Sequence, residues 1–271
     1  NFTALSPIDF LKRTAKIFPN YTSLISENKK FTWGQTFKRC NLLASSLIKK
    51  KIKKGDVVSI MAPNTTAMYE AHFGIPMTGA MLNTINIRLD AKTISYIIGH
   101  SKTKIMFVDT EFLPIIRTAL KIRKKKITII AIKDDNKFSK NIIKEQLYED
   151  FLKKGSKLST SNFKIKDEWS PISLSYTSGT TNKPKGVVTH HRGAYLNAIS
   201  NQLTWNMKKN PTYLWTLPMF HCNGWCFPWT IAALAGKNIC MRKVSSKLIF
   251  KLIKKYNVSH LCGTTVIINL L

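Results

Sequence analysis

The sequence predicts an α/β fold in which layered βαβ units surround largely parallel sheets. Short apolar runs recur along the chain, and most are continuous rather than alternating, as expected of strands that are covered on both faces. Segments whose apolar residues recur at spacings of three and four separate several of these runs, which indicates helices between strands. The expected strands are residues 57–61, 105–108, 127–132, 172–176, 213–217, 238–241 and 258–261.

Capping signals predict three helices near the N-terminus. Ser6-Pro7-Ile8-Asp9 supplies an N-cap serine, a first-turn proline and a capping acid. Thr32-Trp33-Gly34-Gln35 is a capping box, so a second helix is expected from there to the lysine cluster at 49–54. Pro63-Asn64 is expected to cap a third helix after the strand at 57–61. Two further helical periods cover residues 195–205 and 248–256.

Two segments are expected to lie outside this regular pattern. Residues 133–168 are polar and are predicted to form a long surface excursion. Residues 264–271 begin like a helix that stops without a cap, so the chain is expected to continue past Leu271. The most apolar stretch, residues 225–236, contains Pro228 and is shorter than the roughly 20 residues that span a bilayer, so no transmembrane segment is expected.

The charge of the chain raises the question of an anionic partner. The 271 residues contain 43 Lys+Arg and 14 Asp+Glu, which gives a net charge of +29, and 44% are hydrophobic, which excludes disorder for most of the chain. Lysines at 49–54 and 124–126 dominate while arginine, the better ligand for bases and phosphates, is scarce. This favours a lysine-rich solvated surface. A basic nucleic-acid-binding protein and an acidic protein partner remain the alternatives.

The cysteines indicate a reducing environment. Their number is odd and the chain is long enough to be stable without disulfides, so an intracellular location is expected. The cysteines do not decide between the peroxisome and the cytoplasm. A zinc site at His221 is disfavoured because no Cys-x-x-Cys pair is present. A thiol nucleophile at Cys222 is disfavoured because neighbours on a strand point to opposite faces. The cysteines are at positions 40, 222, 226, 240 and 262.

Residues 176–186 carry the strongest chemical signal, reading Tyr-Thr-Ser-Gly-Thr-Thr-Asn-Lys-Pro-Lys-Gly directly after an expected strand. Hydroxyl and glycine residues let backbone N–H groups close round phosphate oxygens, and a lysine supplies the compensating charge. The order Lys185-Gly186 into Val187-Val188 differs from the Gly-Lys-Ser/Thr of a Walker A loop. The segment therefore predicts a nucleotide phosphate site of another class. A plain surface turn would not explain Pro184-Lys185-Gly186.

A second segment, residues 217–225, reads Leu-Pro-Met-Phe-His-Cys-Asn-Gly-Trp. An apolar, aromatic stretch with a single imidazole suits a pocket that is apolar except at the end that receives a carboxylate. The alternative is that Phe220 and Trp225 belong to the core and that His221 is an ordinary hydrogen-bonded histidine.

Both segments resemble the adenylate-forming superfamily, which comprises acyl-CoA synthetases, luciferases and the adenylation domains of peptide synthetases. The family's phosphate signature usually reads Thr-Ser-Gly-Thr-Thr-Gly-x-Pro-Lys-Gly, and Asn182 stands here where glycine is usual. Asparagine is the non-glycine residue that best tolerates positive φ, so the loop path can be kept. Residues 217–225 resemble plant acyl-activating enzymes of short and medium acids, and residues 79–90 resemble a structural segment of the family. The resemblance covers essentially the whole chain.

The resemblance implies an ATP-dependent carboxylic acid:CoA ligase. ATP with Mg²⁺ and a carboxylate would give an acyl-adenylate and pyrophosphate, and coenzyme A as co-substrate would then displace AMP. It also implies that residues 1–271 are a partial N-terminal AMP-binding domain, the N-terminal portion of the large domain of such an enzyme, inactive in isolation. A truncated, non-catalytic nucleotide or acyl binder and the basic nucleic-acid-binding protein remain alternatives; no specific nucleic acid partner is expected.

The family roles fall on particular residues of this sequence. Lys183 is expected to be solvated. His221 would be the catalytic residue, close to the reacting carboxylate, and Thr180 would meet the Mg²⁺ that ATP carries. The acyl substrate would contact Phe220, His221 and Trp225. The triphosphate would contact Thr177, Ser178, Gly179, Thr180, Thr181, Lys185 and Gly186.

Overall fold

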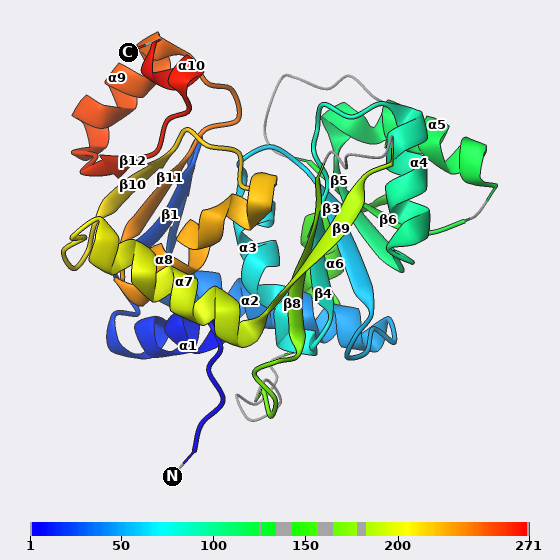
Figure 1. Ribbon diagram of the computed structural model, residues 1–271, viewed down its shortest axis with the longest axis horizontal. Helices are drawn as coiled ribbons and strands as arrows, with labels where there is room; N and C mark the ends of the chain where they lie inside the picture. The colour runs from blue at the N-terminus through cyan, green and yellow to red at the C-terminus, as the bar shows by residue number, and fades with distance from the viewer. Residues whose placement is uncertain (1, 125, 134–142, 157–164, 178–182, 270) are drawn as a thin grey trace.

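The computed structural model describes residues 2–124, 126–133, 143–156, 165–177, 183–269 and 271. Their elements form five layers, in which two sheets alternate with layers of helices (Figure 1). This confirms the expected α/β architecture of largely parallel sheets.

The first sheet has the strand order β12-β10-β11-β1-β2, and only β2 runs antiparallel to its neighbour. The second has the order β7-β6-β5-β3-β4-β8-β9, and only β9 is antiparallel. The strands of the first are β1 (Thr22–Ser26), β2 (Lys29–Thr32), β10 (Thr212–Trp215), β11 (Lys237–Cys240) and β12 (His260–Leu261). Those of the second are β3 (Val57–Met61), β4 (Met81–Thr84), β5 (Ile105–Asp109), β6 (Thr128–Ile132), β7 (Gln146–Leu147), β8 (Pro171–Thr177) and β9 (Lys185–His190).

The helices cover both faces of each sheet. No helix among the described residues combines the length and the apolarity that crossing a bilayer requires. Between the sheets lie α1 (Ile8–Ile17), α2 (Trp33–Lys49), α3 (Thr66–Gly74), α6 (Tyr148–Lys153), α7 (His191–Thr204) and α8 (Phe227–Ala233). The outer layers are α4 (Ala91–His100) with α5 (Leu113–Arg123), and α9 (Ser246–Tyr256) with α10 (Thr265–Ile268).

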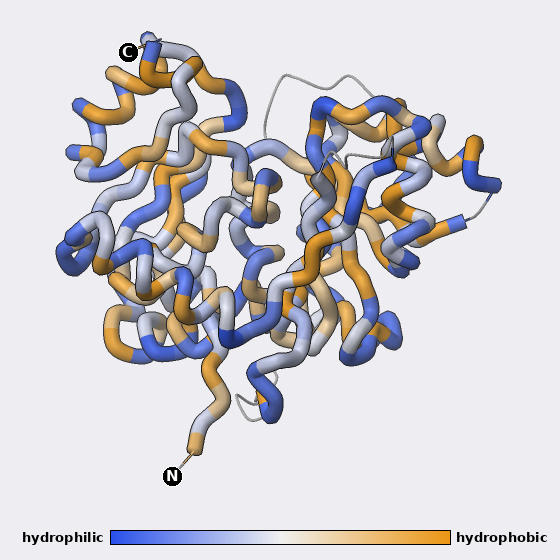
Figure 2. The backbone as a smooth tube through the Cα atoms, viewed as in Figure 1, coloured by the Kyte–Doolittle hydropathy of each residue, from blue (hydrophilic) through white to orange (hydrophobic). Residues whose placement is uncertain are grey.

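Strand β5 shows why its apolar run is continuous. Ile105 and Phe107 face the cluster between the sheets, whereas Met106 and Val108 face the cluster beneath α4 and α5. Because successive side chains on a strand point to opposite faces, each face needs its own apolar set. Figure 2 shows such hydrophobic stretches along the strands, with hydrophilic residues gathered in the peripheral turns.

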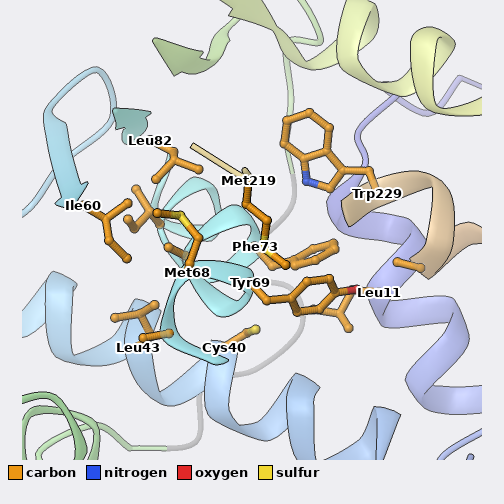
Figure 3. Close-up of a cluster of buried hydrophobic side chains, with 14 of the residues drawn as sticks. Leu11, Cys40, Leu43, Ile60, Met68, Tyr69, Phe73, Leu82, Met219 and Trp229 are labelled. Carbon is orange, nitrogen blue, oxygen red and sulfur yellow. The ribbon is translucent and has the colours of Figure 1, made fainter. Parts of the chain in front are cut away.

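Helix α3 lies at the centre of the molecule and is buried along its whole length. Figure 3 shows its Met68, Tyr69 and Phe73 among side chains from neighbouring helices and strands. A Cβ atom at Gly74 would lie only 2.7 Å from Cδ2 of Leu43 on α2, so glycine permits the close approach of these two helices. The contact packs the end of α3 closely against α2.

The helix starts predicted at residues 6–9 and 32–35 are confirmed in position, although the cap of α1 differs in detail. Gln35 N donates to Thr32 Oγ1 at 3.3 Å and Thr32 N donates to Gln35 Oε1 at 2.9 Å, which is the predicted capping box. At α1, Pro7 occupies the N-cap position, and Ser6 Oγ accepts a hydrogen bond from Ile8 N at 3.3 Å.

The prediction of a surface excursion over residues 133–168 is wrong for its central part. Strand β7 and helix α6 lie there, and α6 buries Phe151 and Leu152 in the core between the sheets. The helix has six residues, too few to give a recognisable helical period. Residues 134–142 and 157–164 lie outside the described residues.

Candidate functional site

A cleft opens at the carboxyl ends of β4 and β8, where parallel strands of an open sheet commonly present binding residues. Thr84 ends β4 and Thr177 ends β8. The segment that follows β10 brings Phe220 and His221 to the same cleft. The structure therefore brings together Thr177, Phe220 and His221, which the sequence places in two distant segments. The cleft lining also includes Thr84, Asn86, Leu89, Ser175, Tyr176 and Cys222.

The phosphate segment sits on the β8–β9 hairpin. Thr177 lies opposite Lys185 in the antiparallel register, so both flank the same loop. Gly186 lies opposite Tyr176, and a Cβ atom on Gly186 would lie 3.1 Å from Cδ1 of Leu174, so glycine relieves a tight contact with that side chain. Lys183 is exposed, as expected. The predicted contacts Ser178, Gly179, Thr180 and Thr181, and the departure at Asn182, lie outside the described residues.

Tyr176 ties the base of this loop to α4. Its hydroxyl oxygen and His100 Nδ1 are 2.7 Å apart and share a hydrogen bond. The His100 ring meets the Tyr176 ring edge-on at 5.8 Å and stacks on Tyr96 at 5.4 Å. Burial, followed by the nearby Tyr96, raises the pKa of Tyr176 to about 12, so the phenol stays protonated and available for this bond.

The segment after β10 is a turn rather than a strand. The predicted strand at 213–217 ends at Trp215, and a run of left-handed residues extends from Cys222 to Cys226, with φ between 41° and 63°. Each non-glycine residue in this region costs roughly 1–2 kcal/mol. Only Gly224 in the run avoids that cost, and a Cβ there would meet Pro228 at 3.2 Å. The turn needs specific contacts to hold it.

Three asparagine side chains supply those contacts. Asn64 Nδ2 donates to Trp215 O at 3.0 Å and to Leu217 O at 2.8 Å, and Asn64 Oδ1 accepts from Met219 N at 2.8 Å. Asn201 Nδ2 donates to Trp225 O at 2.8 Å. Asn223, the third, bonds to β4 and β8.

Asn64 corrects a prediction made from the sequence. Thr65, not Pro63-Asn64, caps α3, since Thr65 Oγ1 accepts from Met68 N at 3.3 Å. Asn64 reaches across to the other sheet instead. The bonding partners of Asn64 are about 150 residues away along the chain, so nothing local in the sequence indicates this role.

The reason given against a thiol nucleophile at Cys222 is wrong, because Cys222 and His221 lie in a turn and both line the cleft. None of the five cysteines forms a disulfide. Burial raises the pKa of the Cys226 thiol to about 11 and so keeps it protonated. Among the described residues, no three His, Cys, Asp or Glu side chains come together in a way that could hold a metal ion.

Trp225 occupies a different place from the other two predicted acyl contacts. Its side chain is 53% exposed, and it is not among the residues that line the cleft with Phe220 and His221. Phe220 is 7% exposed, and its carbonyl accepts a hydrogen bond from Thr84 Oγ1 at 2.8 Å. The structure therefore groups Phe220 and His221 with the phosphate segment and sets Trp225 on the turn beside them.

The chain matches a known protein family and several named relatives. The family model described as "AMP-binding enzyme" matches residues 11–271. The peroxisomal acetate/butyrate–CoA ligase AAE7 of Arabidopsis thaliana is 46% identical over 99% of the chain and 49% of the relative. The peroxisomal benzoate–CoA ligase of the same plant is 48% identical over 100% of the chain and 48% of the relative. The chain thus spans about half the length of the curated relatives it matches.

A solved structure shares the fold. The inhibitor-bound N-terminal domain of FACL13 from Mycobacterium tuberculosis superposes with a TM-score of 0.84 at 24% identity, covering 98% of this chain and 64% of that one. At that identity the likeness extends to the fold alone.

Proposed function

Because the chain belongs to the AMP-binding enzyme family, we propose that its protein activates a carboxylic acid with ATP and transfers the acyl group to coenzyme A. The observation that carries the proposal is the meeting of Thr177, from the phosphate segment, with Phe220 and His221 in one cleft. A carboxylate is a poor electrophile, and forming the adenylate gives it a good leaving group. Relatives named as acetate/butyrate, butyrate and benzoate CoA ligases support this reaction class.

In this proposal the two sides of the cleft have different tasks. The hairpin residues Thr177, Lys185 and Gly186 hold the triphosphate with Ser178, Gly179, Thr180 and Thr181 between them. His221 lies beside the reacting carboxylate and donates to its oxygen, while Phe220 and Trp225 border the acyl group. A preorganised donor at the point where charge develops stabilises the transition state more than the ground state.

Mg²⁺ fits this site only as part of the ATP complex. The described lining of the cleft offers hydroxyl groups, an amide, an imidazole, a thiol and apolar side chains, and it contains no carboxylate. Mg²⁺ prefers carboxylate and phosphate oxygens with several waters. We therefore propose that Mg²⁺ arrives bound to ATP, with Thr180 as its contact from the loop, and supplies charge neutralisation at the phosphates.

The test is acid-dependent exchange of labelled pyrophosphate into ATP, measured on the full reading frame with acetate, butyrate, benzoate and cinnamate. Exchange that requires one of these acids, followed by AMP release on addition of coenzyme A, is the expected result. A folded protein that catalyses no exchange with any acid would refute the proposal. Salt-sensitive DNA binding by such an inactive protein would favour the nucleic-acid-binding alternative.

Two further proposals follow from the relatives. Their length leads us to treat residues 1–271 as part of a larger catalytic unit, and we expect these residues alone to release AMP at under a tenth of the rate of the full reading frame. Equal rates would contradict this. The location is proposed to be the peroxisome, as several relatives are named peroxisomal. Imaging of a fluorescent fusion of the full reading frame tests it against the cytoplasm.

A further inference from the structure

We propose that Asn223 is a positioning residue whose side-chain amide fixes the turn carrying His221 against β4 and β8. The effect of this role on catalysis rests on the proposed function, whereas the contacts that support the role do not. Asn223 is 4% exposed and lies on the left-handed turn, two residues after His221. Asn223 is the only residue of the turn whose side chain bonds to two strands of the second sheet among the described contacts.

The hydrogen bonds form a directed chain. Ser175 Oγ donates to Asn223 Oδ1, and Asn223 Nδ2 donates to Thr84 Oγ1 at 3.2 Å. Thr84 Oγ1 in turn donates to the carbonyl of Phe220 at 2.8 Å. Both arms of the turn, at Phe220 and at Asn223, are thereby tied to Thr84, and one of them also to Ser175, two residues before Thr177.

This series of hydrogen bonds requires an amide side chain at position 223. Thr84 has a single hydroxyl proton, which it gives to the Phe220 carbonyl, so it needs a donor from Asn223. Ser175 donates, so it needs an acceptor. Only a side chain with one N–H group and one carbonyl satisfies both partners. The carboxylate of an aspartate has the same shape but can only accept hydrogen bonds. The single hydroxyl proton of Thr84 would then be shared between that carboxylate and the carbonyl of Phe220.

The backbone at Asn223 makes a second demand. Its φ is 44° and its ψ is 49°, a conformation that asparagine tolerates better than other residues with a side chain. Asparagine therefore satisfies both the left-handed backbone and the two-sided hydrogen bond. Without the hydrogen bonds of the Asn223 side chain, the run from Cys222 to Cys226 would relax toward ordinary dihedral angles. His221 would then move away from the cleft.

The kinetic test uses Asn223→Asp in the full reading frame, with the acid and ATP varied separately in the exchange assay. We expect kcat/KM for the acid to fall about tenfold or more, because a buried hydrogen bond is lost, while KM for ATP changes less than twofold. Thr84→Val should copy this pattern, and Thr84→Ser should recover most of the loss. The matched control is Asn238→Asp, a buried amide in the first sheet bonded to Trp215 and Ser23, which should lower stability without this kinetic split.

A second readout needs no activity. Cys222 is exposed whereas Cys226, on the same turn, is buried. With a thiol reagent such as DTNB under native conditions, the unaltered chain should react rapidly at Cys222 alone, and Asn223→Asp should also react at Cys226. Unchanged Cys226 protection, or equal exposure in Asn238→Asp, would overturn the inference. Failure of acid-dependent exchange in the unaltered protein would instead overturn the proposed function, leaving the thiol result to decide the role of Asn223.

Discussion

Arg242 and Asp109 join the two sheets through a buried ion pair at their carboxyl ends. The Arg242 guanidinium donates to both oxygens of Asp109, the last residue of β5, at 2.7 and 3.0 Å, and also to Glu111 at 3.0 Å. The Arg242 side chain is 4% exposed and the Asp109 side chain 0%. The planar guanidinium and the carboxylate match as a bidentate pair, which fixes the distance between the sheets.

Replacing Arg242 by methionine should lower the free energy of unfolding by about 3–5 kcal/mol, because the Asp109 carboxylate is left buried without its partner. Urea unfolding followed by circular dichroism measures this. Lys153→Ala provides the control, since Lys153 pairs with Asp150 on the surface and its loss should cost less than about 1 kcal/mol. Equal losses in the two variants would show that the Arg242 pair is not a structural bond between the sheets.

The protein should lose stability as the pH falls from about 6.5 toward 4. Burial lowers the pKa of His72 to about 4, and the same cause lowers the pKa of His191 to about 4. Below pH 6.5 the unfolded chain binds protons at these two histidines that the folded chain does not, so unfolding is favoured. Each histidine contributes up to about 3 kcal/mol to the free energy of unfolding, and this contribution is fully present above pH 6.5.

His72→Gln isolates the contribution of one of these two fully buried histidines. Urea unfolding at pH 7.5, 6 and 5 should show a smaller loss of stability on acidification in the variant than in the unaltered chain. Identical pH profiles would mean that His72 does not stay neutral in the folded protein.

Lys185→Ala should slow the first step at least tenfold in the pyrophosphate exchange assay. Lys185 lies opposite Thr177 at the base of the phosphate loop, and a charged contact to phosphate is worth roughly 1.5–3 kcal/mol. Lys183→Ala is the matched control and should have a much smaller effect. Equal effects of the two substitutions would show that Lys185 does not make the proposed contact to the ATP phosphates.

Phe220 and Trp225 can be separated by the acid chain length that the enzyme accepts. Each buried CH₂ adds about 0.8 kcal/mol, so a homologous series of acids should show rising kcat/KM and then a sharp cutoff. Phe220→Ala and Trp225→Ala should each move the cutoff to longer acids. A profile that shifts with Phe220→Ala but stays constant with Trp225→Ala would limit the pocket to the cleft lining and exclude the exposed indole.

Local signals in the sequence predicted most of the elements. Residues 57–61 are bounded by a Gly-Asp turn and a proline, and their apolar run indicates a strand that is buried on both faces. The structure has a strand with the same bounds, Val57–Met61. The capping box at Thr32 likewise fixed the start of α2. Helix α6 was not predicted because six residues give no recognisable period. The hairpin of β1 and β2 was not predicted because strands of five and four residues are too short to show an alternation.

The contacts that shape the cleft are harder to predict, because they join residues far apart in the chain. Asn64 bonds to the segment after β10, and His100 bonds to Tyr176 in the phosphate segment. No spacing rule indicates either pair. The left-handed turn does carry a local signal, since Asn223-Gly224 is a dipeptide typical of turns with positive φ.

The strand order of the first sheet has a consequence for how the protein is made. Strand β1 pairs on one side with β2 and on the other with β11, so Leu24 meets Asn238 only after the residues up to Asn238 have left the ribosome. The second sheet, by contrast, is built from consecutive segments and can assemble first. The edge of β1 that later pairs with β11 therefore stays unpaired during synthesis. Unpaired strand edges readily bind to other chains. Chaperone binding to nascent chains should accordingly concentrate on the N-terminal hairpin and decline once β11 has emerged.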